Sequence, residues 1–354
     1  MAQQHHEMTG TGTGGAGEAL TAYLQDQATE FLRSLRLHRE STTDAQGAQE
    51  SVAAAGSLRR AARRIGGTLH TFRPLLDADW AASLRPELAW LSGTLAQEHA
   101  YASRLHRLLE ALHRLSGSVP VPGPAPEPVG AAAGRQVRAA APAPGADGAP
   151  RGLTVGAAKA AALLERQLTL ARTRAHSAAL QAFGSSRFHA VADQVAVLAS
   201  DVPLSGTADD LKPCAEQADA ALAEAITTLP LGQAGHPYNA GALVHGLAAE
   251  TAPDLQDAPW LQVRSLLRLH RYAQEVLLGP AHPEPRIADA SHALNVHREA
   301  AAAAAAAAQA ARTPRIAPAT AYALGVLHAD QRHEVEAARF AFHRAWLQEE
   351  ARTR

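Results

Sequence analysis

The sequence is poor in lysine, cysteine and aromatic residues, and each shortage narrows the classes of protein that it can encode. Lys159 and Lys212 are the only lysines, so arginine supplies nearly all of the positive charge. Cys214 is the only cysteine, which excludes an intrachain disulfide and favours a reducing compartment. Aromatic residues make up 4% of the chain, and β-branched residues are also scarce. We therefore expect neither a sheet-rich fold nor a disulfide-stabilised one.

Long apolar runs are missing as well. The run Ala300–Ala308 is too short and too weakly hydrophobic to cross a bilayer. The segment Met1–Gly17 is polar and rich in Gly and Thr, without the apolar core of a signal peptide. The sequence therefore predicts a cytoplasmic protein that does not contact membranes.

Strong helix formers, chiefly Ala, Leu, Arg, Glu and Gln, fill most of the chain. Apolar residues recur at helical spacing, as at Leu20, Leu24, Ala28 and Leu32. The predicted class is all-α. Helices are expected over residues 18–39, 45–72, 77–116 (with Gly93 as a candidate break), 154–183, 186–200, 208–228, 259–278, 286–312 and 317–352.

Composition divides the chain into segments. Residues 1–17 are expected to form a disordered tail. Residues 118–151 repeat Pro, Gly and Ala with almost no large apolar group, so we expect a flexible linker or long loop there. Pro203 and Gly206 mark a boundary between two helical bundles, an N-terminal one over 18–200 and a C-terminal one over 201–354.

The formal net charge of −1 argues against a protein that coats nucleic acid, and no sequence-specific nucleic-acid partner is expected. Positive charge is nevertheless concentrated locally. Arg264, Arg268 and Arg271 stand at i, i+4 and i+7, which places them on one helix face, and no acidic residue lies between Asp257 and Glu275. Like charges at that spacing repel, so a stripe without intervening carboxylates predicts an anionic ligand or an acidic partner.

The first half of the chain carries a similar stripe. Arg59 and Arg63 share one helix face, Arg60 and Arg64 share the adjacent one, and His70 continues the basic strip. An offset of about 205 residues superposes Arg59 on Arg264 and Arg63 on Arg268, as expected for two diverged copies of one helical unit.

Guanidinium groups suit phosphate because their planar fork donates paired hydrogen bonds and stays charged at physiological pH. A row of them at roughly 6 Å per helical turn would match a linear polymer with about one charge per phosphate. Two alternatives remain. The arginines form a solvated face, or they pair with carboxylates, including those of the acidic helix expected over 208–228.

The sequence resembles the CHAD family, named for a "conserved histidine α-helical domain". The resemblance covers about residues 18–350 and rests on these motifs: Arg59-x3-Arg63-Arg64 leading into Leu69–Leu76, Arg187-Phe188, and Arg264-x3-Arg268-x2-Arg271-Tyr272-x2-Glu275. It implies two antiparallel helical bundles related by pseudo-two-fold symmetry, with a central basic channel that binds inorganic polyphosphate. The ligand contacts that it implies are Arg59, Arg63, Arg64, Arg264, Arg268 and Arg271.

This chain departs from the family pattern at several positions. The two signature histidines fall at Gly56 and Leu261, and a basic position after Arg64 falls at Gly66. His70 stands where Arg or Lys is usual. The sequence therefore resembles a divergent CHAD member whose binding site is thinned. If His70 contacts the polymer when protonated, binding strengthens below about pH 6.5.

No catalytic motif is found, so we expect a non-enzymatic protein without cofactor or metal. His99, His106 and His113 align on one helix face, but successive members lie about 10 Å apart, too far to share one ion. The predicted function is binding of inorganic polyphosphate in the cytoplasm, with polyphosphate granules as a candidate location. The alternative is a protein-interaction scaffold whose basic face docks an acidic partner.

Overall fold

The described part of the chain folds into α-helices. The computed structural model describes residues 15–41, 47–117, 151–206, 210–236, 241, 244, 253–279 and 284–350. Within these residues no β-strand occurs; a single isolated bridge joins Leu76 to Leu204. The predicted all-α class is confirmed. Most of the tail and linker predicted at 1–17 and 118–151 lies outside the described residues.

The observed helices follow the predicted ones closely. Their bounds are α1 (Gly15–Ser41), α2 (Ala48–Thr71), the 3-10 helix η1 (Arg73–Leu75), α3 (Ala78–Ser116), α4 (Arg151–Phe183), α5 (Ser186–Ser200), α6 (Lys212–Thr227), α7 (Leu231–Ala234), α9 (Pro253–Leu278), α10 (Pro285–Ala311) and α11 (Pro318–Glu350).

The largest differences from the predicted helices concern α3, α9 and α6. The candidate break at Gly93 was wrong, since α3 runs through it without interruption. Helix α9 begins six residues before the predicted start at Pro259, and this proline lies inside the helix, where it removes one backbone hydrogen bond. Helix α6 begins at Lys212, four residues later than predicted.

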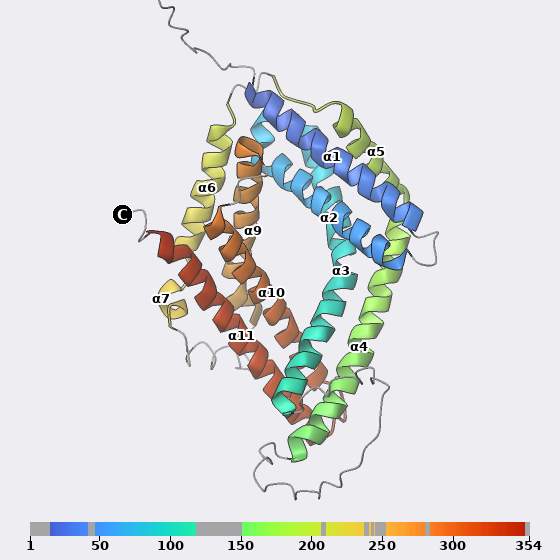
Figure 1. Cartoon of the computed structure of the whole chain (residues 1–354), viewed down its shortest axis with the longest axis vertical. Helices are drawn as coiled ribbons and strands as arrows, with labels where there is room; N and C mark the ends of the chain where they lie inside the picture. Colours follow the sequence, from blue (N-terminus) through green and yellow to red (C-terminus); the bar gives the residue numbers. More distant parts are fainter. Residues whose placement is uncertain are drawn as a thin grey trace, which may run out of the picture.

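The part of the molecule that lies at the top of Figure 1 is built around one hydrophobic cluster. Helices α1, α2 and α5 and the first half of α3 contribute most of it, and α9 adds Ala273 and Val276. Its largest fully buried side chains include Phe31, Phe72 and Phe188. The cluster thereby joins a helix of the second half of the chain to helices of the first.

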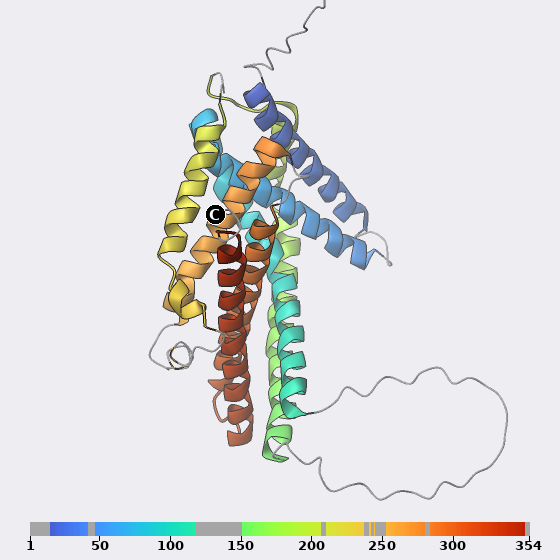
Figure 2. The same ribbon diagram turned by 60° about the vertical axis from the view of Figure 1, so that its left-hand side comes forward.

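The lower part is a long bundle of α3, α4, α10 and α11. The two views show α3 beside α4 and α10 beside α11 (Figures 1 and 2). Helix α10 turns a row of buried alanines toward its neighbours, including Ala303, Ala307 and Ala310. Because alanine has only a methyl side chain, the helix backbones can approach closely along this row.

Helices α2 and α9 meet at a glycine. A Cβ atom built on Gly67 would lie 2.6 Å from a ring carbon of Tyr272, closer than packed carbon atoms stay, and a tight 3.3 Å from Leu269. The neighbouring Gly66 has room, with Leu88 at 3.8 Å. Gly67 therefore lets α9 lie directly on α2, which brings the two arginine-bearing helices together.

Both interior clusters named so far contain residues from before and after residue 201. A third cluster, around Trp260 and Phe342, lies entirely in the second half. The predicted division into bundles at residue 201 and their pseudo-two-fold relation stay predictions. None of the described helices combines the length and apolar composition that a membrane crossing needs.

Candidate functional site

The basic side chains of four helices gather around a cavity of about 610 Å³, here called the central cavity. Helices α2, α3, α9 and α10 each contribute arginines to it. These are Arg59 and Arg63, Arg104 and Arg107, Arg264 and Arg268, and Arg298. Among the described residues, two carboxylates line the cavity, Glu110 and Glu299, and both are exposed. The lining is therefore strongly cationic.

The predicted echo between the two halves has a spatial counterpart here. Arg59 and Arg63 come from α2, and Arg264 and Arg268 come from α9. The shared-face spacing put each pair on one side of its helix, and the crossing at Gly67 turns the two sides toward one cavity. Four of the predicted site residues are thus brought together.

Several guanidinium groups in the central cavity lack a protein acceptor for a buried donor. The Nε atoms of Arg59, Arg63, Arg104 and Arg298 are buried and form no hydrogen bond within the described part of the chain. Arg298 does pair with Glu299 through Nη2, at 3.1 Å. Buried donors without acceptors cost stability, so their clustering at one cavity indicates a site that an anion would complete.

The pKa values of the arginines at the central cavity are lowered by burial and by neighbouring guanidinium charges. Burial, and then the charges of Arg268, Arg298 and Arg63, together lower the pKa of Arg264 to about 9. Burial also lowers the pKa of Arg268, Arg63 and Arg59, with neighbouring guanidinium charges acting in the same direction. All remain protonated at neutral pH, so the free protein holds mutually repelling cations at this cavity.

A second cavity, of about 760 Å³, adjoins the first and is here called the α2–α3 cavity. Arg63 and Arg268 line both cavities. The α2–α3 cavity adds His70, Arg73 and Arg85, and its lining contains no carboxylate among the described residues. The basic surface therefore continues from the central cavity toward the end of α2.

His70 is not an isolated imidazole. Arg85 Nη2 lies 2.8 Å from His70 Nδ1, and because guanidinium can only donate, this nitrogen accepts. Burial, and then the charges of Arg85 and Arg73, lower the pKa of His70. In the free protein the imidazole of His70 therefore stays neutral to a pH below 6.5, the value at which the sequence analysis placed its protonation.

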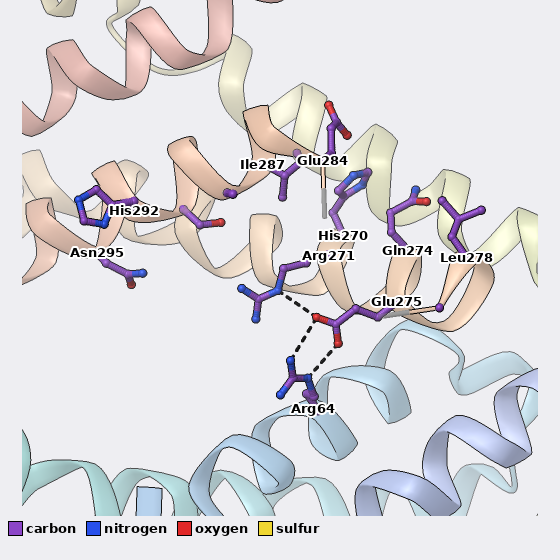
Figure 3. A pocket seen from close by; sticks show the side chains of 13 residues that line it. Arg64, His270, Arg271, Gln274, Glu275, Leu278, Glu284, Ile287, His292 and Asn295 are labelled. Carbon is purple, nitrogen blue, oxygen red and sulfur yellow. Dashed lines mark hydrogen bonds and ion pairs between the residues drawn. The ribbon is translucent and has the colours of Figure 1, made fainter. Parts of the chain in front are cut away.

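The expectation of arginine stripes without carboxylates was wrong for Arg64 and Arg271. Both contact Glu275, as Figure 3 shows. Arg64 donates from Nε to Oε2 at 2.9 Å and from Nη2 to Oε1 at 3.4 Å, and Arg271 Nε lies 3.3 Å from Oε1. The hydrogen bond and charge of Glu275 raise the pKa of Arg64, although burial, the largest single effect, lowers it.

Arg64, Arg271 and Glu275 line a third cavity, of about 480 Å³, between α9 and α10. This α9–α10 cavity adjoins the central cavity at Asn295, which lines both. Arg264 Nε donates to Asn295 Oδ1 at 2.8 Å, so the junction itself is held by an arginine of the central cavity.

Arg60 and His270 do not line the central cavity. Arg60 is exposed, donates to Ser57 Oγ at 2.7 Å and lines a hollow with Arg172 and Glu98 that adjoins the central cavity at Arg59 and His99. His270 is 5% exposed, and its Nδ1 lies 3.4 Å from Asp219 of α6. Its helical phase turns it away from the face that carries Arg268 and Arg271.

The acidic helix α6 does not neutralise the arginines of α9. Within the described residues, its acidic side chains form no ion pair with Arg264, Arg268 or Arg271. Helix α6 instead packs against α9 on the side of His270. The intramolecular form of the acidic-partner alternative is therefore not observed in this part of the chain.

Sequence reasoning missed the arginines of α3 and α10. Arg104, Arg107 and Arg298 lie near Glu110 and Glu299 in sequence, so their segments resemble ordinary mixed-charge helix surfaces. The aligned histidines were the available signal, because His99 and His106 line the central cavity beside Arg104 and Arg107.

Comparisons with known proteins agree with the motif-based resemblance. A family model described as CHAD domain matches residues 26–294. Among solved structures, the chain is similar to PptA from Streptomyces chartreusis, with 57% sequence identity and a TM-score of 0.75. That match covers 94% of this chain and 99% of the other. No curated protein matches the chain.

Proposed function

Because this chain belongs to the CHAD family, we propose that it binds inorganic polyphosphate, without turning it over, in the central cavity and the adjoining α2–α3 cavity. The observation that carries the proposal is the convergence of arginines from α2, α3, α9 and α10 on one cavity. Arg63 and Arg268, which line both cavities, would be the central contacts.

The chemistry of the lining supports a phosphate polymer as ligand. Guanidinium groups bind phosphate oxygens through paired hydrogen bonds, and the buried Nε donors of Arg59, Arg63 and Arg104 would gain acceptors. A polyanion would also relieve the repulsion that lowers the pKa of these arginines. Binding is therefore expected to repay an electrostatic cost that the free protein carries.

The shape of the site favours a slender polymer over an acidic protein partner. The guanidinium groups of Arg63, Arg264 and Arg268 are half-buried at a cavity framed by four helices. A linear chain of phosphates can enter such a cavity, whereas the surface of a folded partner would meet its rim. An acidic protein remains the alternative occupant, and competition with polyphosphate distinguishes the two.

Binding to a polyphosphate resin tests the proposal. The purified protein is expected to stay on the resin at about 0.15 M salt and to elute at high salt, because affinity that rests on displaced counterions falls steeply with ionic strength. Incubation with polyphosphate and Mg²⁺ should release no phosphate. Failure to bind, or binding indifferent to salt, would contradict the proposal.

The pH dependence of binding reports on His70. A bound polyanion favours the protonated imidazole and raises its pKa above the lowered value of the free protein. Protons are then taken up on binding, so affinity is expected to rise as the pH falls from 7 to 5. Because burial, and then the charges of Arg85 and Arg73, hold the pKa of free His70 down, the gain should continue below pH 6.5.

Titrations of the parent and a His70→Ala variant across this pH range separate His70 from the other histidines. The variant is expected to gain less affinity than the parent over this range, because it lacks the imidazole of His70. An equal gain in both proteins would mean that His70 does not titrate with the ligand.

A further inference from the structure

Glu275 is a carboxylate held by three partners from three helices. Tyr23 of α1 donates its hydroxyl to Oε2 at 2.8 Å. Arg64 of α2 approaches both oxygens, and Arg271, one turn earlier on α9, approaches Oε1 (Figure 3). The Glu275 side chain is 12% exposed. This single carboxylate thus hydrogen-bonds Arg64 and forms an ion pair with Arg271, whose Nε makes no hydrogen bond in the described part of the chain.

Both arginines are positioned to join the basic surface if they were free. Their side chains keep 30% and 38% exposure, respectively, so solvent and ligands can reach them. The charge of Arg271 lowers the pKa of Arg63 and Arg268, which places it within electrostatic reach of the central cavity. The α9–α10 cavity that they line also adjoins the central cavity at Asn295.

A carboxylate and a phosphate present oxygens to a guanidinium fork in the same way. On this basis, and resting on the proposed function, we propose that Glu275 is an internal counter-anion that keeps Arg64 and Arg271 from the polyphosphate. Glu275 thereby sets where the polymer-binding surface ends. The polymer contacts the arginines of the central and α2–α3 cavities, while the α9–α10 cavity stays closed to it.

Neutralising Glu275 is the direct test. Glu275→Gln keeps the size of the side chain and an oxygen that can accept from Tyr23, but it removes the charge that holds the two guanidinium groups. Two further cations then become available to the polymer. Affinity for polyphosphate at low salt is expected to rise roughly tenfold. The slope of log affinity against log salt should steepen by about 1.4–1.8 units, because each of the two further phosphate contacts adds about 0.7–0.9.

Glu284→Gln is the matched control for charge. Glu284 lines the same α9–α10 cavity, but its partner is Arg286, at 3.0 Å, and not Arg64 or Arg271. Its replacement removes one negative charge from the same cavity without freeing the pair. Affinity is expected to stay within about threefold of the parent, because solvent and salt screen the effect of an exposed carboxylate on a polymer bound in the central cavity.

A triple variant, Arg64→Gln with Arg271→Gln and Glu275→Gln, shows which residues produce the gain. Its affinity should return to within about threefold of the parent, because the freed cations are gone. Tyr23→Phe removes only the hydroxyl contact and is expected to change the melting temperature but not the affinity. Circular dichroism of each variant checks that the helices remain.

The outcomes separate this inference from the proposed function. If the parent binds polyphosphate and Glu275→Gln binds no more tightly than Glu284→Gln, Glu275 is only a structural anchor and the inference is wrong. A triple variant far weaker than the parent would show that Arg64 and Arg271 already contact the polymer, which also overturns it. A parent that does not bind polyphosphate refutes the proposed function itself.

Discussion

Exchanging Arg63 and Arg268 together for glutamine is expected to weaken polyphosphate binding at least about a hundredfold. These two arginines line both basic cavities, so a polymer that passes between the cavities must pass them. Each contributes charge-assisted hydrogen bonds worth about 1.5–3 kcal/mol, and the pair therefore about 3 kcal/mol or more. Calorimetric titration with polyphosphate of defined length measures the loss.

The matched control exchanges Arg166 and Arg174 of α4 for glutamine. Both are exposed, and neither lines the cavities described above, so the same change in net charge is made away from the site. Affinity should fall less than about threefold, since distant exposed charges are screened. Equal losses in the two double variants would show that binding follows net charge and not the central cavity.

The melting temperature gives the Arg63 and Arg268 exchange a second readout. Burial and neighbouring cations lower the pKa of both guanidinium groups, so their charged forms are less stable in the folded protein than in the unfolded chain. Removing these charges is therefore expected to leave the free protein as stable as the parent or more so. A lost affinity with an unchanged melting curve identifies ligand contacts and excludes misfolding.

Local spacing predicted much of the site because helix faces follow from sequence alone. The i, i+4 relation of Arg59 to Arg63 and of Arg264 to Arg268 placed each pair on one face. That the two faces meet depends on Gly67, whose missing side chain admits Tyr272. The sequence shows the glycine but not its neighbour, so the meeting of the stripes came from the family resemblance and not from residue spacing.

Glu275 shows where that reasoning fell short and why. It lies four residues after Arg271, a spacing at which opposite charges pair on a helix, so this contact was predictable. The contact with Arg64 spans 211 residues and follows only from the crossing of α2 and α9. The stretch without carboxylates is bounded by Asp257 and Glu275, and in the structure both of these residues form ion pairs with arginines.

Asp257 lies in a buried network of ion pairs and hydrogen bonds that the sequence did not indicate. It accepts from Arg332 Nη1 at 2.8 Å and from Arg339 Nη2 at 2.7 Å. Asp257, Arg332, Arg339 and the adjacent His297 are each at most 5% exposed. Arg332 and Arg339 stand in α11, where Glu334 and Glu336 lie between them in the sequence.

Replacing Asp257 with asparagine is expected to lower the free energy of unfolding by about 3–5 kcal/mol, because two buried guanidinium groups lose their shared counter-ion. For a helical protein of this size, the melting temperature should fall by roughly 10 °C. Asp330→Asn is the control on the same helix as Arg332. Its partner Arg114 is largely exposed, so a loss of about 1 kcal/mol or less is expected.

The pH dependence of the stability difference between the parent and Asp257→Asn follows from the direction in which the pKa of Asp257 is shifted. Burial alone would raise the pKa of Asp257, but hydrogen bonds with His297 and Arg332 outweigh it and hold the pKa well below its usual range. The carboxylate therefore stabilises the fold at every pH above its unfolded value near ~3.9, and this contribution is lost only as the pH falls toward the folded value. Burial lowers the pKa of the adjacent His297, and Asp257 partly offsets this, so the gap between parent and Asp257→Asn should not narrow from pH 7 to pH 5.

The network also connects stability to the binding site. Arg264 stands seven residues after Asp257 on α9, two helical turns along the same face, so the anchor at α11 fixes the segment that carries Arg264 into the central cavity. Asp257→Asn is therefore expected to weaken polyphosphate binding at temperatures where the variant is still folded, although Asp257 lines none of the three cavities. Melting and binding curves of Asp257→Asn that coincide with those of Asp330→Asn would show that the buried network contributes no more than a surface ion pair.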